Sequence, residues 1–347
     1  MKVVLRTVTD FNRLDDRMVG QSPEGMPGAS DNRQPFSDVG FGPCECCGSD
    51  RRKTHVVREM MFGTRERFSY LECLGCGCLR IAEVPANLGR YYPKEYDPFK
   101  SGPRDGVKAR LRQSLVSLVI RNRVLLKAVA PSHRFATARL AHALRLTPKT
   151  RILDVGCGGG RLVLDLRAAG FTAWGIDHFA PESVDSKGVV VRRCSLEDLS
   201  EEFDCIMFNH SLEHIADQVE ILSQARARLR SGGVCIVRIP IASWAWREYG
   251  TNWVQLDAPR HLCVHSEKSF RIAAERSGFR VSDTEYDSFD FQFWGSELYL
   301  RNVPLETARP RLSEYFSKAS MKEYRRRSVA LNNQHQGDQA IFFLRQI

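Results

Sequence analysis

The sequence contains no stretch of eighteen residues that is free of charged side chains. A helix that crosses a bilayer needs about 20 mostly apolar residues, so no transmembrane helix is expected. The first residues also lack the apolar core of a secretory signal peptide, because Asp10 interrupts them. The sequence therefore predicts a protein that works in the cytoplasm.

Acidic residues are almost absent between Pro98 and Arg151, where thirteen Lys or Arg residues accompany one acid, Asp105. The rest of the chain carries 38 basic and 40 acidic residues, so the net charge of +10 arises from this stretch. Within it, residues 107–129 place apolar side chains at helical spacing, with a second apolar strip between cations. We expect this basic amphipathic helix either to contact the inner face of an anionic membrane or simply to pack on the core. Nucleic acid is disfavoured as a partner, because residues 43–82 have only a modest surplus of Lys and Arg.

The eleven cysteines cannot all pair, and no secretion signal favours disulfides. Six of them lie between Cys44 and Cys78 and form two C-x-x-C-G turns. Each turn directs two thiolates at one point, and four thiolates make a closed, structural zinc site. The expected ligands are Cys44, Cys47, Cys73 and Cys76, with Cys46 and Cys78 as spare thiols and an iron–sulfur cluster as the less favoured alternative. A module this small has too few residues for a core of its own, so its folding is expected to depend on the metal.

Composition divides the chain into a disordered arm (1–42), a small zinc-ribbon-like module (43–82), a connector with basic amphipathic helices (83–149) and a final segment (150–347). In the final segment, short apolar runs alternate with helical stretches, which is typical of a parallel sheet. The expected strands cover 151–155, 173–176, 189–192, 205–209, 234–239, 280–286 and 339–344, and the expected helices lie near 160–169, 217–230 and 266–277. The pattern predicts an α/β fold with a seven-stranded, mostly parallel sheet and helices on both faces.

The first expected strand runs into the motif D-x-G-x-G-x-G, from Asp154 to Gly160. The dinucleotide fingerprint G-x-G-x-x-G is absent, because position 161 holds Arg161 instead of glycine. Glycines let the backbone turn tightly beside a ligand. The second expected strand ends at Asp177, whose carboxylate can accept hydrogen bonds from both hydroxyls of a ribose.

These features resemble the class I S-adenosylmethionine-dependent methyltransferases, which share a Rossmann-like sheet. The resemblance covers residues 150–286 and 338–345. It implies that the methionine half of the cofactor contacts Asp154, Gly156, Cys157, Gly158 and Gly160. It also implies that the ribose lies on Asp177, that the adenine lies near Leu196 and Glu197, and that Asn209 begins a segment that covers the cofactor. The alternative is a glycine-rich turn without a ligand.

A cysteine-rich module ahead of such a core resembles bacterial methyltransferases that act on sugars, including nucleotide-linked sugars and surface polysaccharides. Tyr92 and Tyr96 of the connector resemble tyrosines that lie over the active site in those proteins, and the string from Asp257 to His261 is similar as well. The insertion 240–265 is rich in tryptophan, which suits stacking against sugar rings or sealing a site from water. The expected substrate contacts are Tyr92, Tyr96, Trp244, Trp246, Trp253 and Arg260. The alternative for the tryptophans is ordinary packing between this loop and the zinc module.

A sugar hydroxyl is weakly acidic, so its methylation calls for a base that titrates near neutral pH. His261, on the tryptophan-rich loop, is the expected base, and His214 is its rival. The predicted activity is methyl transfer from S-adenosylmethionine to a carbohydrate, either a nucleotide-linked sugar or a surface or lipid-linked glycan. The alternatives are a nucleic-acid or protein methyltransferase that grips its substrate with the zinc module and basic helix, and a non-catalytic, zinc-dependent binding protein.

Overall fold

The computed structural model describes residues 42–93, 149–168, 170–179, 183–185 and 188–347. The predicted arm, the basic helix over 107–129 and Tyr96 lie outside these described residues, so they stay predictions. None of the described helices is long and apolar enough to cross a membrane.

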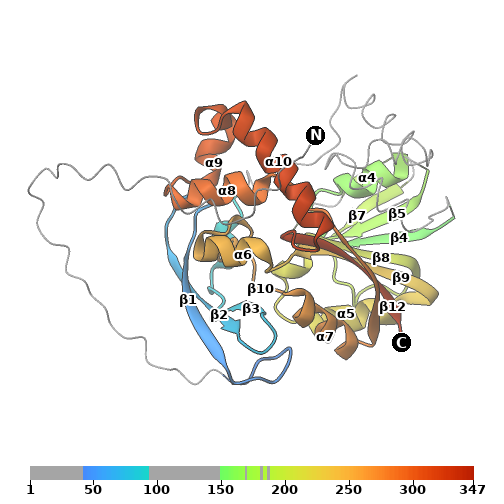
Figure 1. The fold of residues 1–347 in the computed structure, drawn as a ribbon. Helices are drawn as coiled ribbons and strands as arrows, with labels where there is room; N and C mark the ends of the chain where they lie inside the picture. Colours follow the sequence, from blue (N-terminus) through green and yellow to red (C-terminus); the bar gives the residue numbers. More distant parts are fainter. Residues whose placement is uncertain (1–41, 94–148, 169, 180–182, 186–187) are drawn as a thin grey trace, which may run out of the picture. The chain divides into compact units, whose positions relative to one another are not determined.

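Eight strands form the larger sheet, in the order β11-β12-β9-β8-β4-β5-β7-β6 (Figure 1). The strands are β4 (Arg151–Val155), β5 (Thr172–Ile176), β6 (Ser183–Asp185), β7 (Gly188–Arg192), β8 (Phe203–Asn209), β9 (Leu229–Pro240), β11 (Phe279–Tyr286) and β12 (Gln339–Gln346). The pairs β4–β5, β4–β8, β5–β7 and β8–β9 are parallel, whereas β12 is antiparallel to both of its neighbours. The seven predicted strands and the mostly parallel sheet are confirmed. The eighth strand, β6, was not expected: it is a short antiparallel addition to β7.

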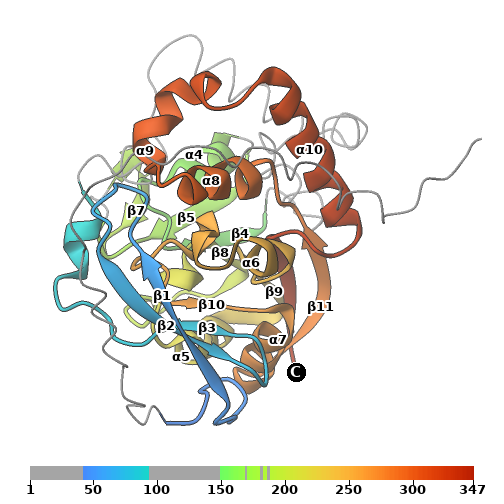
Figure 2. The same cartoon turned by 60° about the vertical axis from the view of Figure 1, so that its left-hand side comes forward.

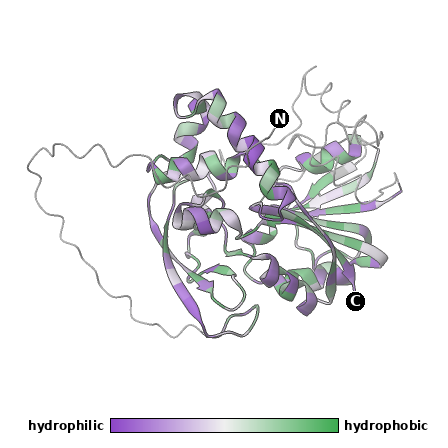
Figure 3. Ribbon diagram, in the orientation of Figure 1, coloured by the Kyte–Doolittle hydropathy of each residue, from purple (hydrophilic) through white to green (hydrophobic). Residues whose placement is uncertain are grey.

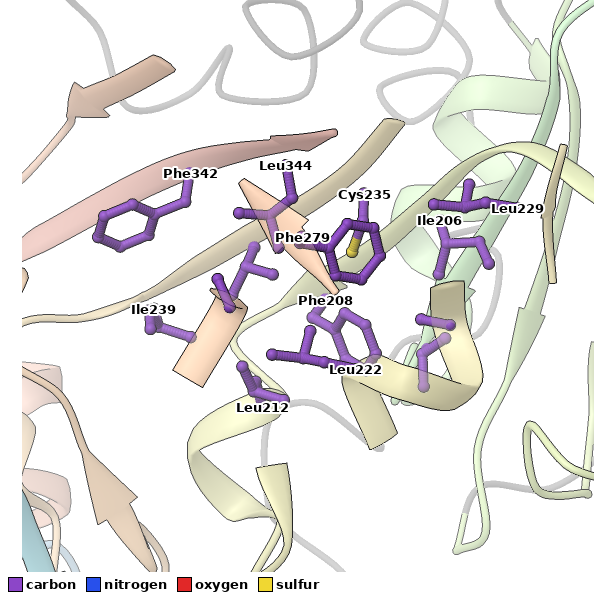
Figure 4. Packing of buried hydrophobic residues seen from close by; sticks show 14 of the residues in the cluster. Ile206, Phe208, Leu212, Leu222, Leu229, Cys235, Ile239, Phe279, Phe342 and Leu344 are labelled. Carbon is purple, nitrogen blue, oxygen red and sulfur yellow. The ribbon is translucent and has the colours of Figure 1, made fainter. Parts of the chain in front are cut away.

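The central strands are apolar on both faces, because helices cover the sheet on each side. One buried cluster fills the face that β8, β9 and β12 share with α5 (Gln218–Ala227) and α7 (Glu267–Arg276). Figure 4 shows part of this cluster, including Phe208, Leu222 and Phe342, and Figure 3 shows the apolar character of the strands. A second cluster, which includes Val163 of α4 (Arg161–Ala168), fills the other face. These three helices are the predicted ones.

A smaller antiparallel sheet contains β1 (Arg52–Arg58), β2 (Arg67–Cys73), β3 (Leu79–Ile81) and β10 (Cys263–Val264) (Figure 2). The first three strands belong to the cysteine-rich module, but β10 comes from the far end of the tryptophan-rich loop and pairs with β3. Residues of the loop also share a buried cluster with Tyr70 and Leu79 of the module. The module therefore completes its sheet and core with residues from the final segment, 150–347.

Four further helices and five 3-10 turns lie outside the predicted set. They are α6 (Trp244–Tyr249), α8 (Phe291–Leu300), α9 (Leu305–Ala308), α10 (Lys318–Asn333), η2 (Leu88–Tyr91), η5 (Leu212–His214), η6 (Gly250–Asn252), η7 (Val254–Leu256) and η8 (Arg309–Glu314). Helix α10 buries only Ser328, so its sequence has no wide apolar stripe that could reveal it. Between β11 and β12, helices α8 to α10 build an apolar cluster that includes Met60 of the module.

Candidate functional site

The glycine loop follows β4 at the carboxyl edge of the larger sheet. Gly156, Gly158 and Gly160 have positive φ angles of 71°, 54° and 76°. A Cβ atom at Gly156 would lie 2.5 Å from the Cβ of Ser211, and one at Gly160 would lie 2.5 Å from Cγ2 of Val191. Both the backbone conformation and the lack of space therefore require glycine here.

Asp177 follows β5 and holds the glycine loop in place. Its Oδ2 accepts a hydrogen bond from the Gly158 backbone N–H at 2.9 Å, and its Oδ1 accepts one from the Phe179 N–H at 2.8 Å. The carboxylate is half-buried beside the loop, as expected for a group that receives part of a ligand at this edge.

Asp154, the last acid of β4, carries an unsatisfied buried oxygen. The residue is 3% exposed, and its Oδ1 has no hydrogen-bond partner among the described residues. Burial, and after it the charge of Asp177, raises the pKa of Asp154 to about 8. A buried acceptor without a partner is costly, and a ligand that donates a hydrogen bond here would remove that cost. The loop and this orphaned oxygen fit a polar ligand such as S-adenosylmethionine.

The other predicted cofactor contacts lie around the same edge. Cys157 packs against Gly175 of β5, and Asn209 at the end of β8 accepts a hydrogen bond from Arg238 at 3.3 Å. Glu197 is exposed and accepts from the Gln224 amide. The Leu196 side chain is only 1% exposed within the core, so this residue can face a ligand only through its backbone.

A histidine cluster (His210, His214 and His261 around Glu213) lies after β8 and on the tryptophan-rich loop. Glu213 is 2% exposed, and its Oε1 lies 3.4 Å from His210 Nδ1 and 4.0 Å from His261 Nε2. Burial alone would raise the pKa of Glu213, but the surrounding imidazoles lower it to about 2. The donor atoms of Glu213, His214 and His261 lie within 4.8 Å of one another, so the cluster can accept a proton or hold a cation. Sequence reasoning missed Glu213, although it directly precedes His214.

His261 is held in one tautomer. Its Nδ1 lies 2.8 Å from the Gln255 carbonyl oxygen, which can only accept, so Nδ1 carries the proton. The second ring nitrogen, Nε2, lies 3.8 Å from Asp257 Oδ2 and 4.0 Å from Glu213 Oε1. The carboxylates of Asp257 and Glu213 are therefore close enough to stabilise an imidazolium at His261.

His214 lies against His261, with ring centroids 4.7 Å apart and the rings edge to face. Its Nδ1 donates to the Arg260 carbonyl oxygen at 2.9 Å, and the Tyr92 hydroxyl lies 3.1 Å from the same nitrogen. Burial, and next the charge of His261, lowers the pKa of His214. Tyr92, a predicted substrate contact, thus lies beside His214, which in turn packs on His261.

The expectation that Arg260 contacts substrate is wrong. Its side chain is fully buried and lies 3.0 Å from Glu59 Oε1 and 2.6 Å from Asp257 Oδ1. Another of its N–H groups donates to the Tyr91 carbonyl at 3.3 Å. Because a buried guanidinium must be paired, Arg260 is saturated by these partners. It joins the module, the connector and the loop, and it fixes the carboxylate of Asp257 beside His261.

The tryptophans contact other parts of the protein. Trp246 and Trp253 share a buried cluster with the module, as the alternative states, whereas half-buried Trp244 also packs against α8. Trp253 is 1% exposed and donates to Asp338 at 2.9 Å. Trp246 donates to Glu72 of the module at 3.2 Å, and Trp244 lies against Phe293 of α8. Sequence spacing could not separate these outcomes, because a tryptophan in a long loop suits a core and a sugar equally well.

The four expected metal ligands converge. The Sγ atoms of Cys44 and Cys76 are 3.7 Å apart, and those of Cys47 and Cys73 are 3.5 Å apart. All four lie within 4.8 Å of one another. Thiolates at the corners of a zinc tetrahedron with bonds of about 2.3 Å are separated by roughly 3.8 Å. The two C-x-x-C-G turns also have the expected glycine geometry, with positive φ at Gly48 and Gly77. The donor set therefore fits one tetrahedral ion.

Comparison with known proteins matches the sheet and the glycine loop. A profile of the family described as "Methyltransferase domain" matches residues 128–284. The ubiquinone biosynthesis O-methyltransferase of Nitrobacter winogradskyi is 26% identical over 189 residues, and the match covers 43% of this chain and 72% of the relative. The protein of the same name from Xanthomonas axonopodis pv. citri is 33% identical over 164 residues, covering 42% of this chain and 67% of the relative. A solved S-adenosylmethionine-dependent methyltransferase from Geobacter sulfurreducens, in complex with S-adenosyl-L-homocysteine, has a TM-score of 0.36 at 18% identity, covering 62% of this chain and 92% of that one.

Proposed function

Since this chain belongs to the class I S-adenosylmethionine-dependent methyltransferases, we propose that it methylates a hydroxyl oxygen of a carbohydrate. The acceptor in this proposal is a nucleotide-linked sugar or a surface or lipid-linked glycan. The observation that carries the proposal is the placement of His261: the Gln255 carbonyl fixes Nδ1, and Nε2 lies near two carboxylates.

The cofactor supplies a methyl group on a positively charged sulfonium. The glycine loop would hold its methionine half, Asp177 would accept hydrogen bonds from the ribose, and Asp154 would offer its unsatisfied oxygen. The chain's own contribution is alignment and the exclusion of water around the reacting oxygen.

His261 then removes the proton of the acceptor hydroxyl through Nε2. Glu213 and Asp257 stabilise the imidazolium, and the Gln255 carbonyl keeps Nδ1 protonated throughout. Tyr92 lies beside the paired histidines and is placed to orient the acceptor. A general base of this kind contributes about 10²–10⁴ in rate.

The curated relatives support a second acceptor class, because their name describes O-methylation in ubiquinone biosynthesis. They match 43% and 42% of this chain, however, and the matching family profile begins at residue 128. The cysteine-rich module and Tyr92 lie before that point. Because these parts carry the resemblance to sugar methyltransferases, they support a carbohydrate as the acceptor.

The two acceptor classes can be separated by following a radiolabelled methyl group. The purified protein is incubated with labelled S-adenosylmethionine and either nucleotide-linked sugars and glycan extracts or phenolic ubiquinone precursors. We expect label in the carbohydrate fraction, with His261→Ala as the inactive control. Label in the phenols alone would overturn the carbohydrate proposal and leave the methyltransferase assignment intact.

The proposal also includes a structural zinc ion on Cys44, Cys47, Cys73 and Cys76. Cys73→Ser should lower the bound zinc and unfold the module, because its folding depends on the metal. Metal analysis and circular dichroism of the full chain check this, with Cys194→Ser outside the cluster as the matched control. A metal-free wild-type protein with a well-ordered module would contradict the zinc assignment.

A further inference from the structure

Three cysteines and a histidine gather next to the first cysteine set without belonging to it. The donor atoms of Cys46, Cys78 and His265 lie within 4.8 Å of one another. The Sγ of Cys263 is 3.3 Å from that of Cys78. Sequence reasoning treated Cys46 and Cys78 as spares and did not consider the other two, because β10 brings them in from more than 180 residues away.

The surroundings of this group suit a metal better than they suit thiols alone. Cys78, Cys263 and His265 are 4%, 4% and 2% exposed. The Cys78–Cys263 separation is far longer than a disulfide bond of about 2.05 Å. The group thus gathers several metal-binding atoms in a small, water-poor space.

The imidazole of His265 is oriented as a metal ligand requires. The Gln218 side-chain amide donates to the carbonyl oxygens of Leu212 at 2.7 Å and Cys263 at 3.2 Å, which fixes its orientation. Its Oε1 therefore accepts from His265 Nε2 at 2.5 Å, and the lone pair is left on Nδ1. Metal-bound histidines typically donate their second ring N–H to such an oxygen.

The His265 Nδ1 atom can exchange its hydrogen bond with Ser269 for a bond to a metal ion. Nδ1 of His265 lies 2.9 Å from the Ser269 hydroxyl. That hydroxyl also lies 3.1 Å from the Ser266 carbonyl, so it has a second acceptor when Nδ1 is occupied. Binding of an ion at Nδ1 would therefore leave no polar group of this set without a partner.

Two cations of α7 donate to backbone carbonyls of the cysteine-bearing segments. Arg276 donates to the backbone carbonyls of Glu45 and Cys46, and Lys268 donates to the Gly75 carbonyl at 2.8 Å. Both belong to α7. The N-cap residue of this helix, Ser266, donates a hydrogen bond to the Cys76 carbonyl in the second C-x-x-C-G turn. A positive helix end beside thiolates lowers the cost of their ionisation.

We propose that Cys46, Cys78 and His265 bind a second zinc ion, with Cys263 as the fourth ligand. The site would be closed and structural, because all four positions of a zinc tetrahedron are taken by protein. Cys46 and Cys78 come from the module, Cys263 from β10 and His265 from just after β10, so the ion would fasten the module to the final segment. Only the total count of ions depends on the zinc site proposed above.

Native mass spectrometry and elemental analysis of the full chain test this proposal. We expect two zinc ions per wild-type chain, one in Cys46→Ser, one in Cys44→Ser and none in the double variant. His265→Asn should also fall to one, and the Cys194→Ser control should keep two. A single zinc ion in the wild type that survives in Cys46→Ser would overturn the second site, as would a Cys46→Ser variant that retains two ions.

The design separates failure of this site from failure of the first one. If the wild type binds one ion that Cys44→Ser keeps and Cys46→Ser loses, the first assignment fails and the second stands. If Cys78 and Cys263 are instead joined as a disulfide, the zinc content is one. In that case the count of reactive thiols in denatured protein falls by two, and the proposal is rejected.

Discussion

The cofactor edge and the histidine cluster meet at the same sheet edge but are built in different ways. The cofactor edge comes from residues 154–177, one β-α-β unit, and it works through backbone N–H groups and glycine conformations. The histidine cluster depends on three distant segments, around Glu59, Glu213 and Asp257, joined by buried charges. Substitutions elsewhere in the chain should leave a loop built from local backbone geometry in place. Removing one member of a buried charge network, by contrast, leaves the other members without partners.

The largest effect should follow from Arg260→Met, which breaks the network at its centre. The substitution leaves the buried carboxylates of Glu59 and Asp257 without their cation. Removing one member of a buried ion group costs about 3–5 kcal/mol. Urea unfolding should show this loss as a lower midpoint at an unchanged slope.

An exposed arginine provides the matched control for that variant. Arg230 pairs with Asp204 at 3.3 Å, and its side chain is 46% exposed. Surface pairs contribute little, so Arg230→Met should change stability by no more than about 1 kcal/mol. Equal losses in the two variants would show that Arg260 does not organise the loop.

At the cofactor edge, Asp177→Ala should weaken binding of S-adenosylhomocysteine. Loss of charge-assisted hydrogen bonds to the ribose costs about 2–4 kcal/mol. Calorimetric titration measures this loss, and Asp283→Ala, at an exposed position of β11, is the control. Wild-type affinity in Asp177→Ala would remove the residue from the site.

Asp154→Asn should make the protein without ligand more stable, increasingly so at higher pH. The pKa of Asp154 is raised to about 8 in the folded protein, against an ordinary value near 4. The protonated carboxyl is fully favourable below about pH 4, and this contribution is lost as the pH rises toward 8. Thermal melts should therefore show a gain of about 1–3 kcal/mol at pH 8 and a smaller one at pH 5. An equal gain at both pH values would mean that the carboxyl does not titrate in this range.

The smallest effect is expected for Trp246→Phe. The variant loses the indole hydrogen bond to Glu72, which contributes about 1 kcal/mol of stability. The KM for the acceptor should not change, because the ring packs on the module. A rise in KM with unchanged stability would restore the sugar-stacking role.

The arrangement of residues at the cofactor edge could be predicted from the sequence because its signals are local. Strand, glycine turn and Asp177 follow one another along the chain as they do in the fold, so pattern and spacing predicted that they lie together. The same holds for Cys44, Cys47, Cys73 and Cys76, since each C-x-x-C-G turn defines its own geometry.

Residues whose roles depend on distant partners could not be assigned in this way. Arg260 was expected to face substrate, but its partner Glu59 lies 201 residues away and fills its hydrogen bonds. Trp253 donates a hydrogen bond to Asp338, which directly precedes β12. The Sγ atom of Cys263 in β10 lies beside that of Cys78, which directly precedes β3. Helix α10 could not be predicted from the sequence because it buries only Ser328 and therefore has no wide apolar stripe.

The role of His261 in methyl transfer is tested most directly by comparing binding and turnover in the two histidine variants. His261→Ala should bind S-adenosylhomocysteine within about twofold of the wild type, yet methylate the acceptor about 10²–10⁴ times more slowly. His214→Ala should retain most of its turnover. Wild-type turnover in His261→Ala, or a loss confined to His214→Ala, would contradict the account.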